Sequence, residues 1–191
     1  MKAQHIVLFV IAGIIGFVIA FYVSFTGMDS GWLMPISLAI GVGIPLFLLI
    51  RLLFINKPVH RAGKGEEATA RSGAPPAGAA ALFVYRDQFV GRLVGTDLTV
   101  DDKPVGQLRG KTFYRFDLPA GEHAVKSSMA GKATGGLTVT LKVGERVYVR
   151  EAFEMGMIKN TLTLSIAAAT EGAKAVGKCR LLQTAALAAL A

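Results

Sequence analysis

His123 is the residue of the C-terminal half whose chemistry is most versatile, because an imidazole can act as a general base or a metal ligand near neutral pH. It follows the predicted turn at Leu118–Gly121, and either role requires partners within hydrogen-bonding distance. The sequence shows no set of acid, base and nucleophile around it, so we predict a structural histidine. Asp101 and Asp102 could ligate a cation, but an aspartate pair that opens a turn is typical of local backbone hydrogen bonding.

Three further motifs have the residue types of functional sites. The glycine-rich stretch 130–136 lacks the spacing of a phosphate-binding loop, since Ala133 follows its lysine, and it favours a flexible hairpin loop. Met155 and Met157 could form an adaptable binding rim, or a loop over the core, which we favour. Cys179 is the single cysteine, so an internal disulfide and a cysteine-built zinc site are excluded. We expect no catalytic residue, no cofactor and no metal.

Alternation of apolar and polar residues predicts the elements that position these side chains. It is clearest at 137–143 and 146–150, which flank Gly144 and predict a hairpin. Further short strands are predicted at 82–86, 98–100, 112–118, 123–127 and 161–166. About seven short strands separated by turn residues favour a small all-β sandwich over 82–168.

Two other segments flank this predicted sandwich. Residues 56–81 are rich in glycine, alanine, proline and charge, and lack the apolar period of a core, so they predict a flexible basic linker. Residues 169–191 contain good helix formers and predict a C-terminal helix or tail.

The N-terminal 55 residues contain two uncharged apolar runs, 6–25 and 32–50, with a link of six residues between them. At about 1.5 Å per residue, a 20-residue helix spans about 30 Å, the thickness of the hydrocarbon core of a bilayer. The sequence therefore predicts a transmembrane helical hairpin, and the whole chain an α+β membrane protein in which the hairpin precedes the sandwich and a C-terminal helix.

Small residues recur every four positions on both runs, which predicts narrow faces for close helix packing. These positions are Ala12, Gly16 and Ala20 on the first run, and Ser37, Gly41 and Pro45 on the second. Pairing within the hairpin and pairing with another subunit both remain open.

The net charge of +8 raises the question of an anionic partner. Basic residues that follow the second apolar run form a flank that anionic lipid would attract: Arg51, Lys57, Arg61 and Lys64. The positive-inside rule then places both termini on the cytoplasmic side of a bacterial inner membrane. The basic residues of the C-terminal part are scattered among acidic ones, so membrane lipids are expected as partners and nucleic acid is not.

Four motifs in order resemble the bacterial family called domain of unknown function 2846, and two of them also resemble the PEGA domain. They are Val84–Arg86, Leu98–Gly106, Asp117–His123 and Val143–Arg150. The resemblance covers roughly 82–182 and implies a small β-sandwich of bacterial envelope proteins without an established activity. Many relatives are exported lipoproteins by resemblance, whereas this sequence has no lipobox cysteine near its start.

Together these observations predict a non-enzymatic accessory protein of the inner membrane, whose tethered β-sandwich docks a partner protein through sheet edges and loops. An alternative is a homo-oligomeric membrane assembly, a pore or ring, with the β-domain as gate or sensor. No ionisable residue lies inside either apolar run, which argues against an ion-coupled transporter.

Overall fold

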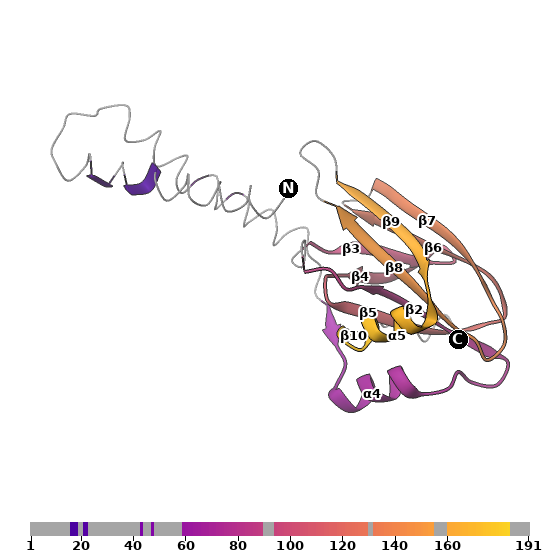
Figure 1. Ribbon diagram of the computed structural model, residues 1–191. Helices are drawn as coiled ribbons and strands as arrows, with labels where there is room; N and C mark the ends of the chain where they lie inside the picture. Colours follow the sequence, from indigo (N-terminus) through magenta and orange to yellow (C-terminus); the bar gives the residue numbers. More distant parts are fainter. Residues whose placement is uncertain are drawn as a thin grey trace. The chain divides into compact units, whose positions relative to one another are not determined.

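The structure is a computed structural model that describes residues 16–18, 21–22, 43, 47, 59–89, 94–129, 132–154 and 160–183. The chain divides into two compact units, Met1–Ile55 and Asn56–Ala191. In the second unit, the described residues form two β-sheets and two helices (Figure 1). Because most of the first unit lies outside the described residues, the fold below is that of the second.

The larger sheet has six strands in the order β1-β10-β5-β2-β8-β9. Their bounds are β1 His60–Arg61, β2 Ala79–Arg86, β5 Thr112–Pro119, β8 Arg146–Glu154, β9 Thr161–Ala167 and β10 Arg180–Gln183. The pairs β10–β5 and β2–β8 are parallel, and the other pairs are antiparallel. Strands distant in the sequence therefore build the centre of this sheet.

The smaller sheet is antiparallel and has four strands in the order β4-β3-β6-β7. Their bounds are β3 Thr96–Val100, β4 Lys103–Leu108, β6 Gly121–Met129 and β7 Lys132–Leu141. One apolar core joins the two sheets, with Leu82 and Val84 of β2 on one side and Leu98, Val125 and Val139 on the other. The second unit is thus a β-sandwich.

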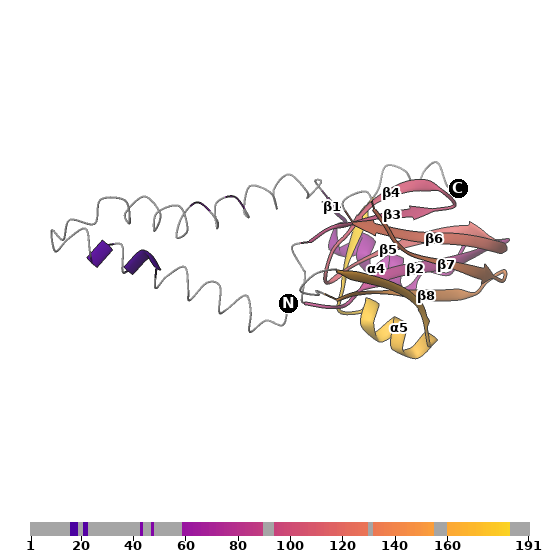
Figure 2. The ribbon, with the colours of Figure 1, turned by 90° about the horizontal axis from the view of Figure 1, so that it is seen from above.

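Two helices cover the other face of the larger sheet. They are α4 (Lys64–Ser72) and α5 (Ala169–Val176). A second apolar cluster lies there, which groups Phe83 of β2 and Phe113 of β5 with Val176 and Cys179. Figure 2 shows α5 on the side of the six-stranded sheet that faces away from β3 and β4. The layers are therefore small sheet, large sheet and helices.

The predicted fold class, an α+β membrane protein with a two-helix hairpin, is wrong. The structure is mostly β-sheet, and in its described residues no helix is long and apolar enough to cross a membrane. The same finding contradicts the predicted location, a multi-pass protein of the bacterial inner membrane with cytoplasmic termini. Hydropathy and run length indicate that a segment is apolar, but they do not by themselves specify one continuous spanning helix.

Most of the predicted helix-packing and lipid-flank residues lie outside the described residues: Ala12, Ala20, Ser37, Gly41, Pro45, Arg51 and Lys57. Gly16 is described, and a Cβ added there would meet nothing within 4 Å. Arg61 lies exposed in β1, where it pairs with Leu182 of β10, and Lys64 is the exposed first residue of α4. These two basic residues therefore belong to the sandwich unit.

The segment predicted as a flexible linker, 56–81, is largely structured where it is described. It contains β1, α4 and the first residues of β2. The predicted 137–143/146–150 hairpin is also wrong, because β7 and β8 belong to different sheets. The turn between them crosses from one sheet to the other, and Gly144 donates its N–H to Ala79 O at 2.9 Å.

The turn between β4 and β5 supports a first prediction. Lys111 has φ 63°, in the left-handed region that disfavours a residue with a Cβ. Both of its backbone groups are bonded, its N–H to Arg86 O at 2.7 Å and its carbonyl to Arg180 N at 2.9 Å. Lys111→Gly should therefore raise the free energy of unfolding by about 0.5–1 kcal/mol. Urea unfolding would measure the gain, and Lys111→Ala, which keeps the Cβ, should show none of it.

Candidate docking site and the polar clusters around it

The C-terminal end of α4 is held by two arginines of the large sheet. Arg115 of β5 donates from Nη1 to Ala70 O at 2.9 Å and to Gly73 O at 3.0 Å. Its Nε and Nη2 bond the carboxylate of Asp117 at 3.0 and 2.8 Å, which fixes the plane of the guanidinium. Arg146 of β8 donates from Nη2 to Ser72 O at 2.7 Å and to Gly73 O at 3.0 Å.

These contacts satisfy helix carbonyls that have no partner within the helix. The last four carbonyls of any helix are left unpaired, and they carry the negative end of the helix dipole. Two guanidinium groups supply both hydrogen bonds and positive charge at that end. We call Arg115 and Arg146 the arginine clamp, and it holds α4 from the side of the sheet.

The middle of α4 is held by a buried carboxylate. Glu67 is 6 % exposed, and its Oε1 accepts the backbone N–H of Leu181 in β10 at 3.0 Å. The same oxygen lies 3.3 Å from Arg71 Nη2 and 3.5 Å from Arg180 Nε. Arg71 also covers the Phe113 ring, with 5.8 Å between Cζ and the ring centroid. Polar contacts, more than apolar burial, therefore attach α4 to the sheet.

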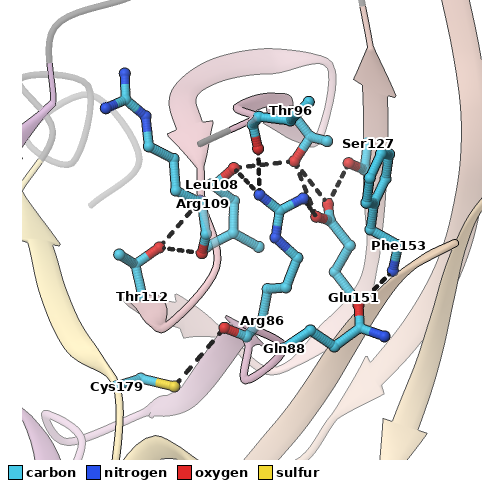
Figure 3. A network of polar contacts seen from close by, with 11 residues as sticks. Arg86, Gln88, Thr96, Leu108, Arg109, Thr112, Ser127, Glu151, Phe153 and Cys179 are labelled. Carbon is cyan, nitrogen blue, oxygen red and sulfur yellow. Dashed lines mark hydrogen bonds and ion pairs between the residues drawn. The ribbon is translucent and has the colours of Figure 1, made fainter. Parts of the chain in front are cut away.

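A second polar cluster lies between the two sheets and is shown in Figure 3. Arg86 of β2 and Glu151 of β8 are both fully buried, and Arg86 Nη1 lies 3.2 Å from Glu151 Oε1. Thr96 of β3 donates to Glu151 from 2.9 Å, and Ser127 of β6 also donates to it. Arg86 donates in addition to Leu108 O at 3.2 Å and to Val94 O.

This cluster braces the sandwich. Burial raises the pKa of Glu151, while Arg86 and the two hydroxyl groups oppose that rise. Arg86 remains charged at any ordinary pH, so an anionic partner compensates it. Because both charged side chains are 0 % exposed, neither can reach a solute, and their contacts join β2 and β8 of the larger sheet to β3, β4 and β6 of the smaller one.

A third cluster lies where the β3–β4 turn meets β6. Asp101 and Asp102 have φ 50° and 60°, as the two-residue type I′ hairpin turn requires, which agrees with their predicted turn role. Asp101 accepts the N–H of Ala124 at 2.9 Å and lies 2.7 Å from His123 Nδ1. His123 Nε2 lies 2.9 Å from Pro119 O.

Both ring nitrogens of His123 thus face acceptors, so the doubly protonated imidazolium fits this position best. Burial lowers the pKa of His123, but the bonds to Asp101 and Pro119 outweigh it, and the pKa lies above its ordinary 6.5. Burial likewise raises the pKa of Asp101, but the bonds from His123 and Ala124 outweigh it, and the pKa lies below 3.8. These contacts tie the β3–β4 turn to the start of β6, and the structural role of His123 stays a prediction.

The pKa shifts of His123 and Asp101 predict that the stability of the fold depends on pH. A raised histidine pKa contributes stability that is complete below about 6.5 and is lost as the pH rises through the folded pKa. The depressed pKa of Asp101 contributes stability above about 3.8 that is lost as the pH falls. The urea midpoint should therefore decline as the pH rises above about 6.5, and Asp101→Asn should flatten that part of the profile. An unchanged decline in the variant would contradict the assignment.

Among the other predicted motifs, Cys179 borders the first two of these clusters. Cys179 is buried, burial raises its pKa to about 11, and its Sγ lies 3.8 Å from Arg86 O. Met155 and Met157 lie outside the described residues, and most of the predicted flexible loop 130–136 belongs to β7. Within the described chain, no group of three or more His, Cys, Asp or Glu could hold a metal ion.

Sequence reasoning missed the arginine clamp and the buried ion pair. The Arg86–Glu151 ion pair left a signal in the sequence. Leu82, Val84 and Arg86 stand at every second position along β2, so the side chain of Arg86 lies on the same face of the strand as the other two. Glu151 likewise lies on the same face of β8 as Val147 and Val149. Opposite charges on the buried faces of two strands indicate an internal ion pair. The clamp had no comparable indicator, because its targets are backbone carbonyls.

Fold and clusters together define a β-sandwich domain with helices held on one sheet face. No family model matches the chain. It is similar to an uncharacterized protein of Haemophilus influenzae, with 29 % identity over 128 residues, which cover 66 % of this chain and 76 % of that protein. The resemblance to the domain of unknown function 2846 and the PEGA domain stays a prediction.

Proposed function

We propose that this protein is a non-enzymatic docking protein, and that the outer face of its six-stranded sheet binds a partner protein. The observation that supports this most is the arginine clamp, which holds the end of a short polar helix on that face. A sheet face that holds a helix through side chains directed at its backbone can accept helices of varied sequence, because backbone carbonyls are common to all of them.

Strand addition, the docking mode predicted for the sheet edges, finds less support than docking on this face. The edge strand β4 carries Lys103 and Pro104, residues that protect a sheet edge from pairing. The edges β7 and β9 lie against each other, since a Cβ added at Gly135 would lie 3.1 Å from Leu162 O. Docking on the helix-bearing face is therefore the mode we propose.

A photocrosslinking amino acid would test this proposal in cells that produce the full chain. Lys178 is exposed beside Cys179, whose carbonyl accepts Arg71 of α4 at 2.7 Å, so a crosslinker at 178 samples the proposed face. Thr138 is exposed on the smaller sheet and provides the matched control. We expect one partner protein captured from position 178 in clear excess over 138. Equal capture from both positions would contradict docking at this face.

A second candidate function is self-association. In the first unit the described apolar side chains are largely exposed, with Phe17 at 55 %, Phe21 at 63 % and Phe47 at 61 %. Phe17 and Phe21 stack with ring centroids 6.5 Å apart. Exposed aromatic residues of this kind favour burial against a second copy. Light scattering would detect an oligomer, and Phe17→Ser with Phe21→Ser should return it to a monomer.

A further inference from the structure

The helix α4 depends on the sheet for its structure. It has nine residues, and Ala68 and Ala70 are its apolar ones. Isolated helices shorter than about 12–15 residues are marginal in water even when alanine-rich. The clamp and the buried contacts of Glu67 therefore supply most of what keeps residues 64–72 helical.

The contacts that hold α4 are also ones that water can replace. Carbonyls of the last turn and the guanidinium groups of the clamp can each be solvated when they separate. Directly after α4 the chain runs through Gly73–Gly78, which includes Pro75 and Pro76, before it enters β2. Gly78 has φ 81°, a conformation that suits glycine in a turn. Six residues therefore separate the end of α4 from the start of β2.

Beneath α4 lies a surface suited to a helix. Phe113 lies under Arg71, and Phe83 lies under Arg115, with 5.8 Å from guanidinium carbon to ring centroid in both cases. The backbone N–H of Leu181 points at the position that the Glu67 carboxylate occupies. If α4 left, this face would present the two phenylalanine rings, the backbone N–H of Leu181 and the two guanidinium groups of the arginine clamp.

We propose that α4 is an internal occupant of this face, and that a partner helix of the same chemistry binds there in exchange for it. This inference rests on the proposed function and specifies its partner. The partner helix carries a carboxylate where Glu67 lies, a small residue three positions later where Ala70 lies, and its C-terminal end within the following turn. The carboxylate accepts Leu181 N–H, and the terminal carbonyls accept the arginine clamp.

Hydrogen exchange on the full chain tests whether α4 detaches. Amides within α4 should exchange at least about 100-fold faster than those of β2 and β5, because local opening needs less free energy than global unfolding. If α4 amides exchange only at the rate of the central strands, α4 is an integral part of the fold and the proposal is overturned.

A fluorescent peptide of residues 62–78 then serves as the probe for the emptied face. Glu67→Gln in the full chain removes the ion pairs to Arg71 and Arg180 but keeps an oxygen for Leu181 N–H. The wild-type peptide should bind this variant about tenfold more tightly than it binds the wild-type chain, a difference of about 1.4 kcal/mol. Adding Thr138→Ala, on the smaller sheet, should leave this gain unchanged. No peptide binding to a folded Glu67→Gln chain would overturn the proposal.

Crosslinking from position 178 in the Glu67→Gln chain separates this proposal from the docking function itself. Increased capture of the partner supports exchange. Unchanged capture leaves docking in place and overturns exchange. Peptide binding without any captured partner supports the exchangeable face and contradicts the proposed function.

Discussion

Replacing Glu151 by leucine should lower the free energy of unfolding by about 3–5 kcal/mol, which is the usual effect of breaking a buried ion pair from one side. The substitution leaves the Arg86 guanidinium fully buried without its anion, and it removes one acceptor from Thr96 and from Ser127. Urea unfolding followed by circular dichroism gives the free energy. Glu154→Leu, an exposed position at the end of the same strand, should change it by no more than about 0.5 kcal/mol.

A double-mutant cycle shows whether the loss comes from the pair. Arg86→Met combined with Glu151→Leu should be less destabilising than the sum of the single changes, because no uncompensated charge remains buried. The expected coupling is at least about 1 kcal/mol. If the two changes were additive, the effect of each would be one of packing alone, and the ion pair would not brace the sheets.

Period-two alternation predicted strands well because it reports which face of a strand is buried. Residues 82–86, 112–118 and 161–166 all lie within strands of the structure. Alternation does not report which strand lies beside which, and the expected hairpin of β7 and β8 failed for that reason. The parallel pairing of β2 with β8 joins segments about 65 residues apart, and no local pattern specifies it.

The missed elements share a physical cause: each is held by contacts that composition does not reveal. The strand β4 was missed because Pro104 and Gly106 are poor strand residues, yet β4 pairs with β3 across the Asp101–Asp102 turn. The helix α4 was missed because it lacks an apolar period, and the arginine clamp takes the place of apolar burial. A segment with the composition of a linker can thus fold when another part of the domain binds its backbone.

Phe83 is a fully buried aromatic residue of the apolar cluster on the helix-bearing face. Its ring is fully buried, stacks on Tyr148 with centroids 4.8 Å apart and lies 6.4 Å from Phe113. Phe83→Ala should lower the free energy of unfolding by about 3–5 kcal/mol, the range for a buried phenylalanine that leaves a cavity. Urea unfolding checks the value, and Val143→Ala, at a position 65 % exposed, should change it by no more than about 0.5 kcal/mol.

Phe83→Leu distinguishes the volume of the ring from its stacking. Leucine refills much of the cavity but cannot stack on Tyr148 or lie under Arg115, so it should recover most of the loss and leave about 1 kcal/mol unrecovered. If α4 rests on this ring, its amides should also exchange faster in Phe83→Leu than in wild type. Full recovery of stability with unchanged exchange in α4 would show that the ring only fills space, and that the arginine clamp holds the helix without it.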